Sequence, residues 1–249
     1  MRHAVLIEAP TDLTSAGEIQ RRFMPQSRPR IDGVDYSARC RQMHAIGGDF
    51  YDFVPFANGR LAITIGDASG KGVSAALMMS NVLSSLRTAA FFVGHNPAAA
   101  IAAVNRQVCD SSPADRYATL FYGAFDSATR TLRYVNAGHC PPMLIRRDNS
   151  ILWLDQGGAP VGMFPDWKYE EGFIELHPGD FVVAYTDGVV EATDPDGEEW
   201  GVENLRQIVA GARRRTADDM VDAIFDVMDQ FALGVQADDA TALVLNVPV

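Results

Sequence analysis

The stretch Arg60–Gly72, RLAITIGDASGKG, decides how this sequence folds. It begins as an apolar β-strand and runs directly into Gly66 and Asp67, and its last two glycines allow a tight turn before a long apolar helix. A Walker phosphate loop is excluded by spacing, because only three residues separate its first two glycines and glycine follows the lysine. A strand-end carboxylate of this kind is unfavourable unless a cation binds it.

Three other acidic stretches also lie at the ends of predicted strands. They are GGD at Gly47–Asp49, TDG at Thr186–Gly188 and DD at Asp238–Asp239. Each one alone is more typical of a turn than of a binding site. Together with Asp67 they place several carboxylates at strand ends with too few Arg or Lys residues to pair with them. Because Mg²⁺ and Mn²⁺ prefer oxygen ligands, the set predicts a divalent-cation site.

The order of predicted elements indicates an α+β fold with antiparallel sheets, because helices and strands occur in separate blocks. Asn58-Gly59 predicts a hairpin turn, and Thr216 with Asp219 predicts a helix capping box. The stretch His177–Asp180 predicts a turn that joins the strands before and after it, in a fold where hairpins dominate. Helices are expected over Val73–Val93, after Asn96-Pro97, near Val202–Ala212 and over Ala217–Phe231. Strands are expected over Gly33–Arg39, Phe50–Phe56, Arg60–Ile65, Thr119–Phe125, Thr131–Val135, Met143–Ile145, Ile151–Leu154, Phe173–Leu176, Phe181–Tyr185 and Thr241–Val247.

An N-terminal helix is predicted over Asp12–Met24, with Thr11 or Asp12 as its cap and Pro25 as its end. Its apolar residues share one side, and they are Leu13, Ala16, Ile19 and Phe23. We expect this side to dock on the rest of the chain or to pair with another copy.

Composition narrows the class of protein. The 249 residues are 47% hydrophobic and carry a net charge of −11, which disfavours a surface for nucleic acid or for an anionic membrane. The three cysteines do not form a disulfide framework, and the first ten residues are not a secretory signal. These features favour one domain with a short N-terminal appendage, located in the cytoplasm.

Six motifs in this order resemble those of the metal-dependent protein phosphatases (PPM), in the bacterial branch that is SpoIIE-like and RsbU-like. The resemblance extends from about Ile19 to Val247. The motifs are GGDFYDF (Gly47–Phe53), GDASGKG (Gly66–Gly72), ATLFYG (Ala118–Gly123), NAGHCPP (Asn136–Pro142), YTDGVVEA (Tyr185–Ala192) and DDATALV (Asp238–Val244).

The resemblance implies a four-layer αββα sandwich, with two antiparallel sheets flanked by helices, and two Mn²⁺ or Mg²⁺ ions at one edge. It implies that Asp67 bridges both ions, that Asp187 and Asp238 hold one, and that Asp49 and the carbonyl of Ala68 help to hold the other. Asp239 is read as a neighbour of these ligands. Residues 29–249 then form the phosphatase domain, and residues 1–28 form an N-terminal helix and linker.

The resemblance also implies an activity. A hydroxide that bridges the two cations would attack phosphoserine or phosphothreonine, so no protein nucleophile is needed. The substrate expected for this branch is a phosphorylated anti-sigma-factor antagonist with a STAS domain. A sensor or regulatory domain is expected to act through the N-terminal helix, and a homodimer is an alternative use of that helix.

Several other residues are of types that can take part in catalysis, and the sequence favours a structural or surface role for most of them. Lys71 stands where the family often has histidine, and we consider it a contact for phosphate or a solvated lysine. His139 is interpreted as a buried residue that shapes its loop. Cys140 and Arg146 match the spacing of cysteine phosphatases by chance, because two prolines remove the amides that such a loop needs. Arg39 and Arg41 could attract phosphate, but we expect them simply to face solvent.

Two alternative functions remain at this stage. One is a catalytically inactive domain that binds a phosphoprotein, which the intact set of acidic residues disfavours. The other is a nucleotide cyclase of the GGD type, which is disfavoured because Phe50 and Tyr51 follow Asp49 where a glutamate would be needed.

Overall fold

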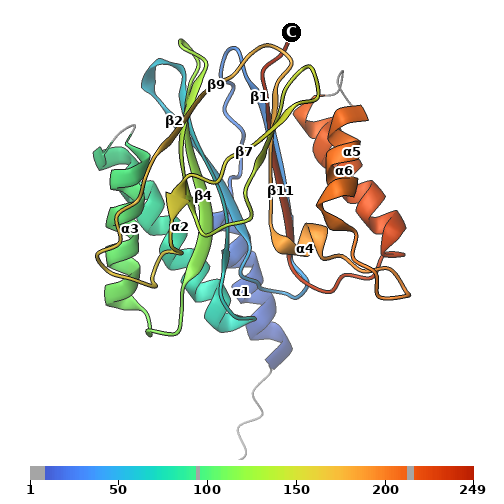
Figure 1. Ribbon diagram of the computed structural model, residues 1–249. Coiled ribbons are helices and arrows are strands. Elements are labelled where there is room, and N and C mark those ends of the chain that lie inside the picture. The colour runs from blue at the N-terminus through green and yellow to red at the C-terminus, as the bar shows by residue number, and fades with distance from the viewer. Residues whose placement is uncertain (1–8, 94–95, 212–215) are drawn as a thin grey trace, which may run out of the picture.

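The computed structural model describes residues 9–93, 96–211 and 216–249 (Figure 1). Its helices are α1 (Ala9–Phe23), the short 3₁₀ turn η1 (Ala57–Gly59), α2 (Val73–Val93), α3 (Pro97–Ser111), α4 (Asp187–Val190), α5 (Gly201–Gly211) and α6 (Ala217–Phe231). Its strands are β1 (Asp35–Arg41), β2 (Phe50–Phe56), β3 (Arg60–Ala68), β4 (Ala118–Asp126), β5 (Thr131–Ala137), β6 (Met143–Ile145), β7 (Ile151–Trp153), β8 (Gly157–Gly158), β9 (Gly172–Glu175), β10 (Phe181–Tyr185) and β11 (Ala240–Asn246).

The strands form two sheets that pack face to face between two layers of helices. One sheet has the order β1-β11-β10-β6-β7, and the other has the order β2-β3-β4-β5-β8, with β9 paired to β5. In Figure 1, α2 and α3 cover one sheet on the left, and α5 and α6 cover the other on the right. The predicted α+β, four-layer sandwich is therefore confirmed.

Three apolar clusters hold these layers together. The central cluster joins the two sheets, with Ile63 and Ile65 of β3 facing Val182 and Leu243 of the opposite sheet. A second cluster joins α5 and α6 to their sheet, and a third joins α2 and α3 to the other. Because both faces of each sheet are covered, β10 and β11 are buried along their whole length, as their apolar sequences predict.

The pairing of strands differs from the prediction in two places. The sheets are not wholly antiparallel, because Asn136 and Ala137 of β5 pair in parallel with β8. The turn after β9 does not close a hairpin, because β9 pairs with β5 whereas β10 pairs with β6 and β11 in the other sheet. The chain crosses between the layers at this turn, and a local sequence pattern does not distinguish such a crossing from a hairpin.

Helix α1 corrects the prediction for the N-terminus. The helix already includes Ala9, the first described residue, so Thr11 and Asp12 lie inside it rather than at its cap. Its apolar stripe is only partly buried. Phe23 packs against the cluster of α2 and α3, whereas Leu13 and Ile19 are exposed. The residues that face inward are Gly17 and Gln20. Residues 1–8 of the predicted N-terminal segment, and Ala212 of the predicted helix near Val202, lie outside the described residues.

Helix α2 is long and apolar enough to cross a membrane by those two criteria alone, and 44% of its most apolar window is buried inside the protein. Its buried side chains include Met79, Val82 and Leu83, which pack against α3 and the sheet beneath. This is the pattern of a core helix, as the sequence predicts.

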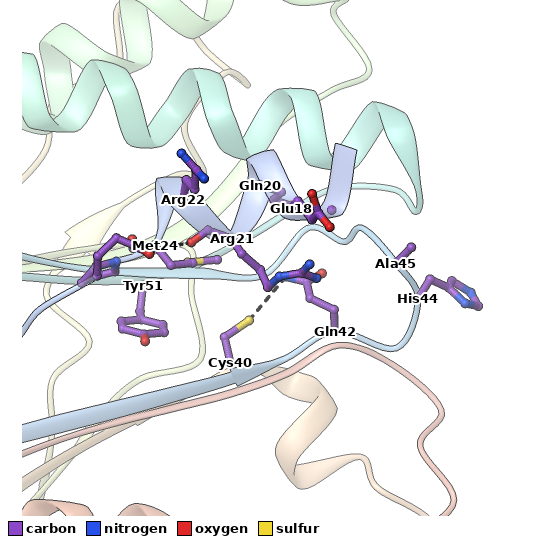
Figure 2. A pocket seen from close by; sticks show the side chains of 13 residues that line it. Glu18, Gln20, Arg21, Arg22, Met24, Cys40, Gln42, His44, Ala45 and Tyr51 are labelled. Atoms are coloured by element: carbon purple, nitrogen blue, oxygen red, sulfur yellow. Dashed lines mark hydrogen bonds between the residues drawn. The ribbon is translucent and has the colours of Figure 1, made fainter. Parts of the chain in front are cut away.

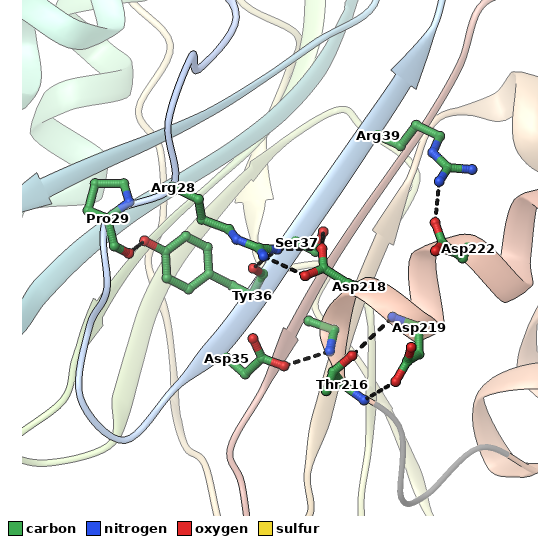
Figure 3. Close-up of polar contacts among 11 residues, drawn as sticks. Arg28, Pro29, Asp35, Tyr36, Ser37, Arg39, Thr216, Asp218, Asp219 and Asp222 are labelled. Atoms are coloured by element: carbon green, nitrogen blue, oxygen red, sulfur yellow. Dashed lines mark hydrogen bonds and ion pairs between the residues drawn. The ribbon is translucent and has the colours of Figure 1, made fainter.

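Polar contacts attach the first turn of α6 to β1 (Figure 3). Asp218 accepts hydrogen bonds from Arg28 Nη1 and Ser37 Oγ, both at 2.6 Å. Arg39 pairs with Asp222. Arg41 donates to the two carboxylate oxygens of Asp229 through its Nη1 and Nη2 atoms. The two arginines also lie over the ring of Phe225, 5.1 and 5.2 Å from its centre. Arg39 is exposed, as expected, and Arg41 is partly buried, with 33% of its side chain exposed; both also anchor α6, which the sequence did not indicate.

The capping box of α6 is confirmed and provides a stability test. Thr216 Oγ1 accepts a hydrogen bond from Asp219 N, and the Asp219 carboxylate accepts one from Thr216 N, both at 3.1 Å. We predict that Thr216→Ala lowers the free energy of unfolding by about 1 kcal/mol, because the first turn loses its side-chain acceptor. Urea denaturation measures the change. Thr216→Ser is the matched control and should retain nearly full stability, and equal losses in both variants would contradict the assignment.

Candidate metal centre

The predicted acidic residues meet at one end of the sandwich, the end where α4 lies in Figure 1. Asp67 is near the end of β3 and Asp49 directly precedes β2 of the same sheet. Asp187 follows β10 and Asp238 precedes β11, both of the opposite sheet. A pocket of about 380 Å³ opens between them, and it is lined by Asp49, Asp67, Ser69, Gly70, Lys71, Tyr117, Thr119, Gly138, His139, Cys140, Asp187, Asp238 and Asp239.

Asp49 is the most buried of these carboxylates, with 1% of its surface exposed. Thr186 and Thr241, both fully buried, each donate a hydroxyl hydrogen bond of 2.7 Å to its Oδ2 atom. Burial, together with the nearby charge of Asp67, raises the pKa of Asp49 well above its ordinary value, and the two hydroxyls only partly offset this. The threonines belong to the opposite sheet, so they fix Asp49 across the interface between the layers.

Asp67 lies among like charges. Burial and the carboxylates of Asp187, Asp238 and Asp239 raise its pKa from 3.8 to about 7. The only cationic side chain among the residues that line the pocket is Lys71, which acts in the opposite direction. A positive ligand would therefore stabilise this group of carboxylates.

Lys71 binds a member of the acidic set. Its ammonium nitrogen is 2.9 Å from Asp238 Oδ2, and the side chains are 64% and 51% exposed. Asp187 is also exposed, and its Oδ1 accepts a hydrogen bond from Gly188 N. Within the described ranges, no three Asp, Glu, His or Cys side chains are already gathered closely enough to hold an ion.

The donor set nevertheless fits hard divalent cations. Asp49, Asp67, Asp187 and Asp238 supply carboxylate oxygens only, and they line one water-accessible pocket. Ala68 does not line this pocket, but a Cβ atom built on Gly48 would lie 2.6 Å from its carbonyl oxygen and 2.7 Å from Asp67 Oδ1. Only glycine fits at position 48, which keeps the GGD loop beside Asp67 and Ala68.

Asp239 has a different role from its neighbour. Its two carboxylate oxygens accept hydrogen bonds from the backbone, Oδ1 from Met43 N at 2.7 Å and Oδ2 from Gly48 N at 2.8 Å. Both oxygens thus have partners in the loop before Asp49. This agrees with its interpretation as a neighbour of the ligands.

His139 and Cys140 also line the pocket, and neither is charged at neutral pH. Burial lowers the pKa of His139 to about 4, and its Nδ1 atom is 3.0 Å from Thr119 Oγ1. Asn136 holds the backbone of His139 through two hydrogen bonds, of 2.7 and 3.0 Å. These contacts match a histidine that shapes its loop.

A cysteine-phosphatase loop is absent at Cys140. Burial and the charges of Asp187 and Glu191 raise the pKa of the Cys140 thiol to about 11, so it is not a nucleophile at neutral pH. Arg146 binds Asp180 and the carbonyl of Glu175 instead of facing the cysteine.

Sequence reasoning missed the residues that support the ligands. Thr186 and Thr241 were visible in the TDG and DDAT motifs, but their direction toward Asp49 depends on the packing of the two sheets. Gln42 donates to the carbonyl of Asp49 at 3.1 Å, and Gln236 donates to that of Asp238 at 2.7 Å. No motif contains either glutamine, so no signal in the sequence identified them.

The chain is similar to a known protein family and to curated relatives. The family model described as Stage II sporulation protein E (SpoIIE) matches residues 57–248. Protein IcfG of Synechocystis sp. is 28% identical over 264 residues, which cover 93% of this chain and 41% of that protein. Phosphoserine phosphatase RsbU of Bacillus subtilis is 27% identical over 242 residues, which cover 96% of this chain and 71% of that protein. The chain thus spans less than half the length of IcfG.

Solved structures show the same fold. The SiaA-PP2C domain of Pseudomonas aeruginosa superposes with a TM-score of 0.85 at 21% identity, covering 98% of this chain and 99% of that one. The catalytic domain of the serine/threonine phosphatase PstP, solved in complex with two manganese ions, superposes with a TM-score of 0.63 at 15% identity, covering 87% and 99%. At these identities the likeness concerns the fold.

The raised pKa of Asp67 predicts how the stability of the metal-free protein depends on pH. Between its ordinary value of 3.8 and its value of about 7, folded Asp67 binds more protons than the unfolded chain does. The contribution of the neutral carboxyl is complete below pH 3.8 and is lost as the pH rises through 7. We therefore expect the free energy of unfolding in EDTA to fall between pH 5 and pH 8, and to recover when Mn²⁺ is added at pH 8.

Urea denaturation at several pH values measures this dependence. Asp67→Asn should make it less steep, because the amide cannot ionise while Asp49, whose pKa is also raised, still titrates. The exposed control Asp32→Asn should leave the dependence unchanged. An identical pH dependence in Asp67→Asn and the wild type would contradict the prediction.

Proposed function

This chain belongs to the SpoIIE family of PP2C-type phosphatase domains, and from that premise we propose that it is a metal-dependent protein serine/threonine phosphatase. One observation carries the proposal. The four acidic motifs, which are far apart in the sequence, converge on a single pocket on a fold shared with PP2C phosphatases. The curated relatives RsbU and RsbP are both named phosphoserine phosphatases.

We propose that two Mn²⁺ or Mg²⁺ ions bind here, with Asp67 shared between them. Asp187 and Asp238 would hold one ion, and Asp49 and the Ala68 carbonyl would help to hold the other. When bound, such cations supply Lewis-acid chemistry, which lowers the pKa of water and offsets negative charge on phosphoryl oxygens. The acidic donor set and its single cationic neighbour, Lys71, support this assignment.

The chain's own residues orient the reaction and bind its substrate. Thr186 and Thr241 donate hydrogen bonds to Asp49 Oδ2. The other carboxylate oxygen, Oδ1, has no threonine partner and is the one that would face a metal ion. Lys71 is the cationic group that lines the pocket, and as an exposed point charge it would contact a phosphate oxygen of the substrate. His139 is neutral at pH 7 and keeps its loop in place. No cysteine nucleophile takes part.

The proposed substrate is a phosphoserine or phosphothreonine on an anti-sigma-factor antagonist of the STAS type. The resemblance of the sequence motifs to this branch suggests this substrate class, and the relative RsbU is named a phosphoserine phosphatase. We further propose that residues 29–249 form the catalytic domain in the cytoplasm. Residues 1–28 would then connect it to a sensor domain or a second copy, since Leu13 and Ile19 of α1 are 42% and 61% exposed.

The rival functions have less support. A nucleotide cyclase built on GGD is disfavoured by the family match and by the sandwich fold. A catalytically inactive binding domain is disfavoured because Asp49, Asp67, Asp187 and Asp238 are all present in one pocket. A hydrolysis assay distinguishes an active phosphatase from an inactive binding domain.

We predict that the purified chain hydrolyses p-nitrophenyl phosphate when Mn²⁺ is present and loses the activity in EDTA. Asp67→Asn and Asp187→Asn should each lower kcat by about 10²-fold or more, because charge-stabilising groups at the reacting phosphate contribute on that scale. Cys140→Ser should retain activity. Metal-independent hydrolysis that is abolished by Cys140→Ser would overturn the proposed function.

The same assay with a phosphoserine-bearing STAS protein tests the substrate class. Release of phosphate from that protein, and not from its phosphotyrosine counterpart, is expected. An enzyme that hydrolyses p-nitrophenyl phosphate but not the phosphorylated STAS protein would support the phosphatase activity and rule out this substrate class.

Lys71→Met separates two roles for the lysine. A phosphate contact that is equally strong in the ground and transition states predicts little change in kcat. It predicts a KM higher by about twofold to fivefold, the range for one exposed ionic contact. A proton donor predicts a lower kcat and the loss of the basic limb of the pH–rate profile. Steady-state kinetics from pH 6 to pH 10 measure both, with Lys168→Met as the control. An unchanged KM would contradict the phosphate contact.

A further inference from the structure

Helix α1 lies directly against the loop that carries Asp49. The contact is close at Gly17, where a Cβ atom would lie 2.3 Å from the carbonyl oxygen of Ala45. Gly17 is buried although it belongs to a surface helix. The loop Gln42–Gly48 therefore packs on the backbone of α1 at a distance that only glycine permits.

The next inward-facing residue of α1 binds the loop by hydrogen bonds. Gln20 is 5% exposed, and its amide makes two contacts with one residue of the GGD motif. Gln20 Nε2 donates to the carbonyl of Gly47 at 2.6 Å, and Gly47 N donates to Gln20 Oε1 at 3.1 Å. A buried amide that satisfies both backbone groups of one residue fixes that residue in position and orientation.

Figure 2 shows Gln20 and Gln42 among the residues that line the pocket between α1 and the β1–β2 region. Gln42 Nε2 donates to the carbonyl of Asp49 at 3.1 Å. The backbone on either side of Gly48 is thus held by a glutamine amide, at Gly47 by α1 and at Asp49 by the end of β1.

The opposite side of the loop is held by the last strand and by β3. Asp239 accepts a hydrogen bond from Gly48 N, and Ala68 N donates to the carbonyl of Gly48 at 3.2 Å. The same glycine approaches Asp67 Oδ1 so closely that a Cβ atom would be 2.7 Å away. A shift of Gly47 would therefore move Gly48 relative to Asp67 and Ala68, and would move Asp49 with it.

Helix α1 does not depend on Gln20 alone for its attachment. The carbonyl of Phe23 accepts a hydrogen bond of 2.5 Å from Arg87 Nη2 of α2, and Arg87 also binds the buried Asp52. Phe23 and Met24 pack against the cluster of α2 and α3. Removal of the Gln20 amide should therefore leave α1 docked.

From these contacts we propose that Gln20 is a positioning residue of the metal centre, which sets the GGD loop so that Asp49 and Ala68 present their oxygens beside Asp67. The inference rests on the proposed function for the identity of the ligands. It adds that α1, which contributes no ligand, controls how tightly the site holds a divalent cation.

The test is Gln20→Met in the full chain, which keeps a side chain of similar length and removes both hydrogen bonds. Mn²⁺ binding, measured by calorimetry without any substrate, should weaken by about tenfold, the scale found for residues that orient metal ligands. Amide exchange of the segment 43–49 should become faster in the metal-free variant. Gln20→Glu can still accept from Gly47 N, and its Mn²⁺ affinity should lie nearer to that of the wild type.

The matched control is Gln26→Met. Gln26 lines the same pocket, but its amide donates only to Arg21 and Met24 at the end of α1. It should bind Mn²⁺ as the wild type does. The proposal is overturned if Gln20→Met binds Mn²⁺ with unchanged affinity, or if Gln26→Met weakens binding to the same extent.

These measurements separate the inference from the phosphatase proposal. A wild-type chain whose Mn²⁺ affinity depends on Gln20 but which hydrolyses no phosphoester supports the positioning role and rejects the proposed function. An active phosphatase whose Mn²⁺ affinity and amide exchange at residues 43–49 are the same in Gln20→Met as in the wild type supports the proposed function and rejects the positioning role. A wild-type chain that binds no Mn²⁺ overturns both.

Discussion

Mutual repulsion among carboxylates at one end of the sandwich is the constraint around which the structure is arranged. Asp67 has a pKa of about 7 because burial and three neighbouring carboxylates oppose its ionisation. The protein tolerates this arrangement because the surrounding backbone is firmly held, by the central core between the sheets and by hydrogen bonds to Asp49 and Asp239. If a divalent cation binds here as proposed, it would restore the stability lost at this point, and folding would then be coupled to metal binding.

The two-sheet architecture explains how the site is assembled. Each sheet contributes two of the proposed carboxylate ligands, so neither sheet alone can form the pocket. Thr186 and Thr241 cross the interface to bind Asp49, and Thr186 N donates to the carbonyl of Thr241 between neighbouring strands. The spacing of the ligands thus depends on the same packing that buries the central core. Helix α1 adds a further support from outside the sandwich, through Gln20 and Gly47.

Much of the fold was predictable because its elements have strong local signals. The predicted Val73–Val93 helix, the capping box at Thr216 and the helix after Asn96 are all confirmed. Apolar periodicity and turn chemistry depend on residues close in the sequence. The failures concern relations between distant segments: β9 pairs with β5 rather than with β10, and Arg39 and Arg41 bind α6. Sequence patterns do not specify the partners of edge strands or of surface arginines.

The sequence by itself determined the donor chemistry. It placed Asp49, Asp67, Asp187 and Asp238 at the ends of strands, with a glycine beside each of the first three, and the order of the motifs identified the family. Only the tertiary structure decided that Asp239 binds the GGD loop, that Lys71 pairs with Asp238, and that Gln20 reaches Gly47. The physical reason is that a residue's type and its local backbone are encoded nearby, whereas the direction of its side chain depends on packing between segments as far as 196 residues apart.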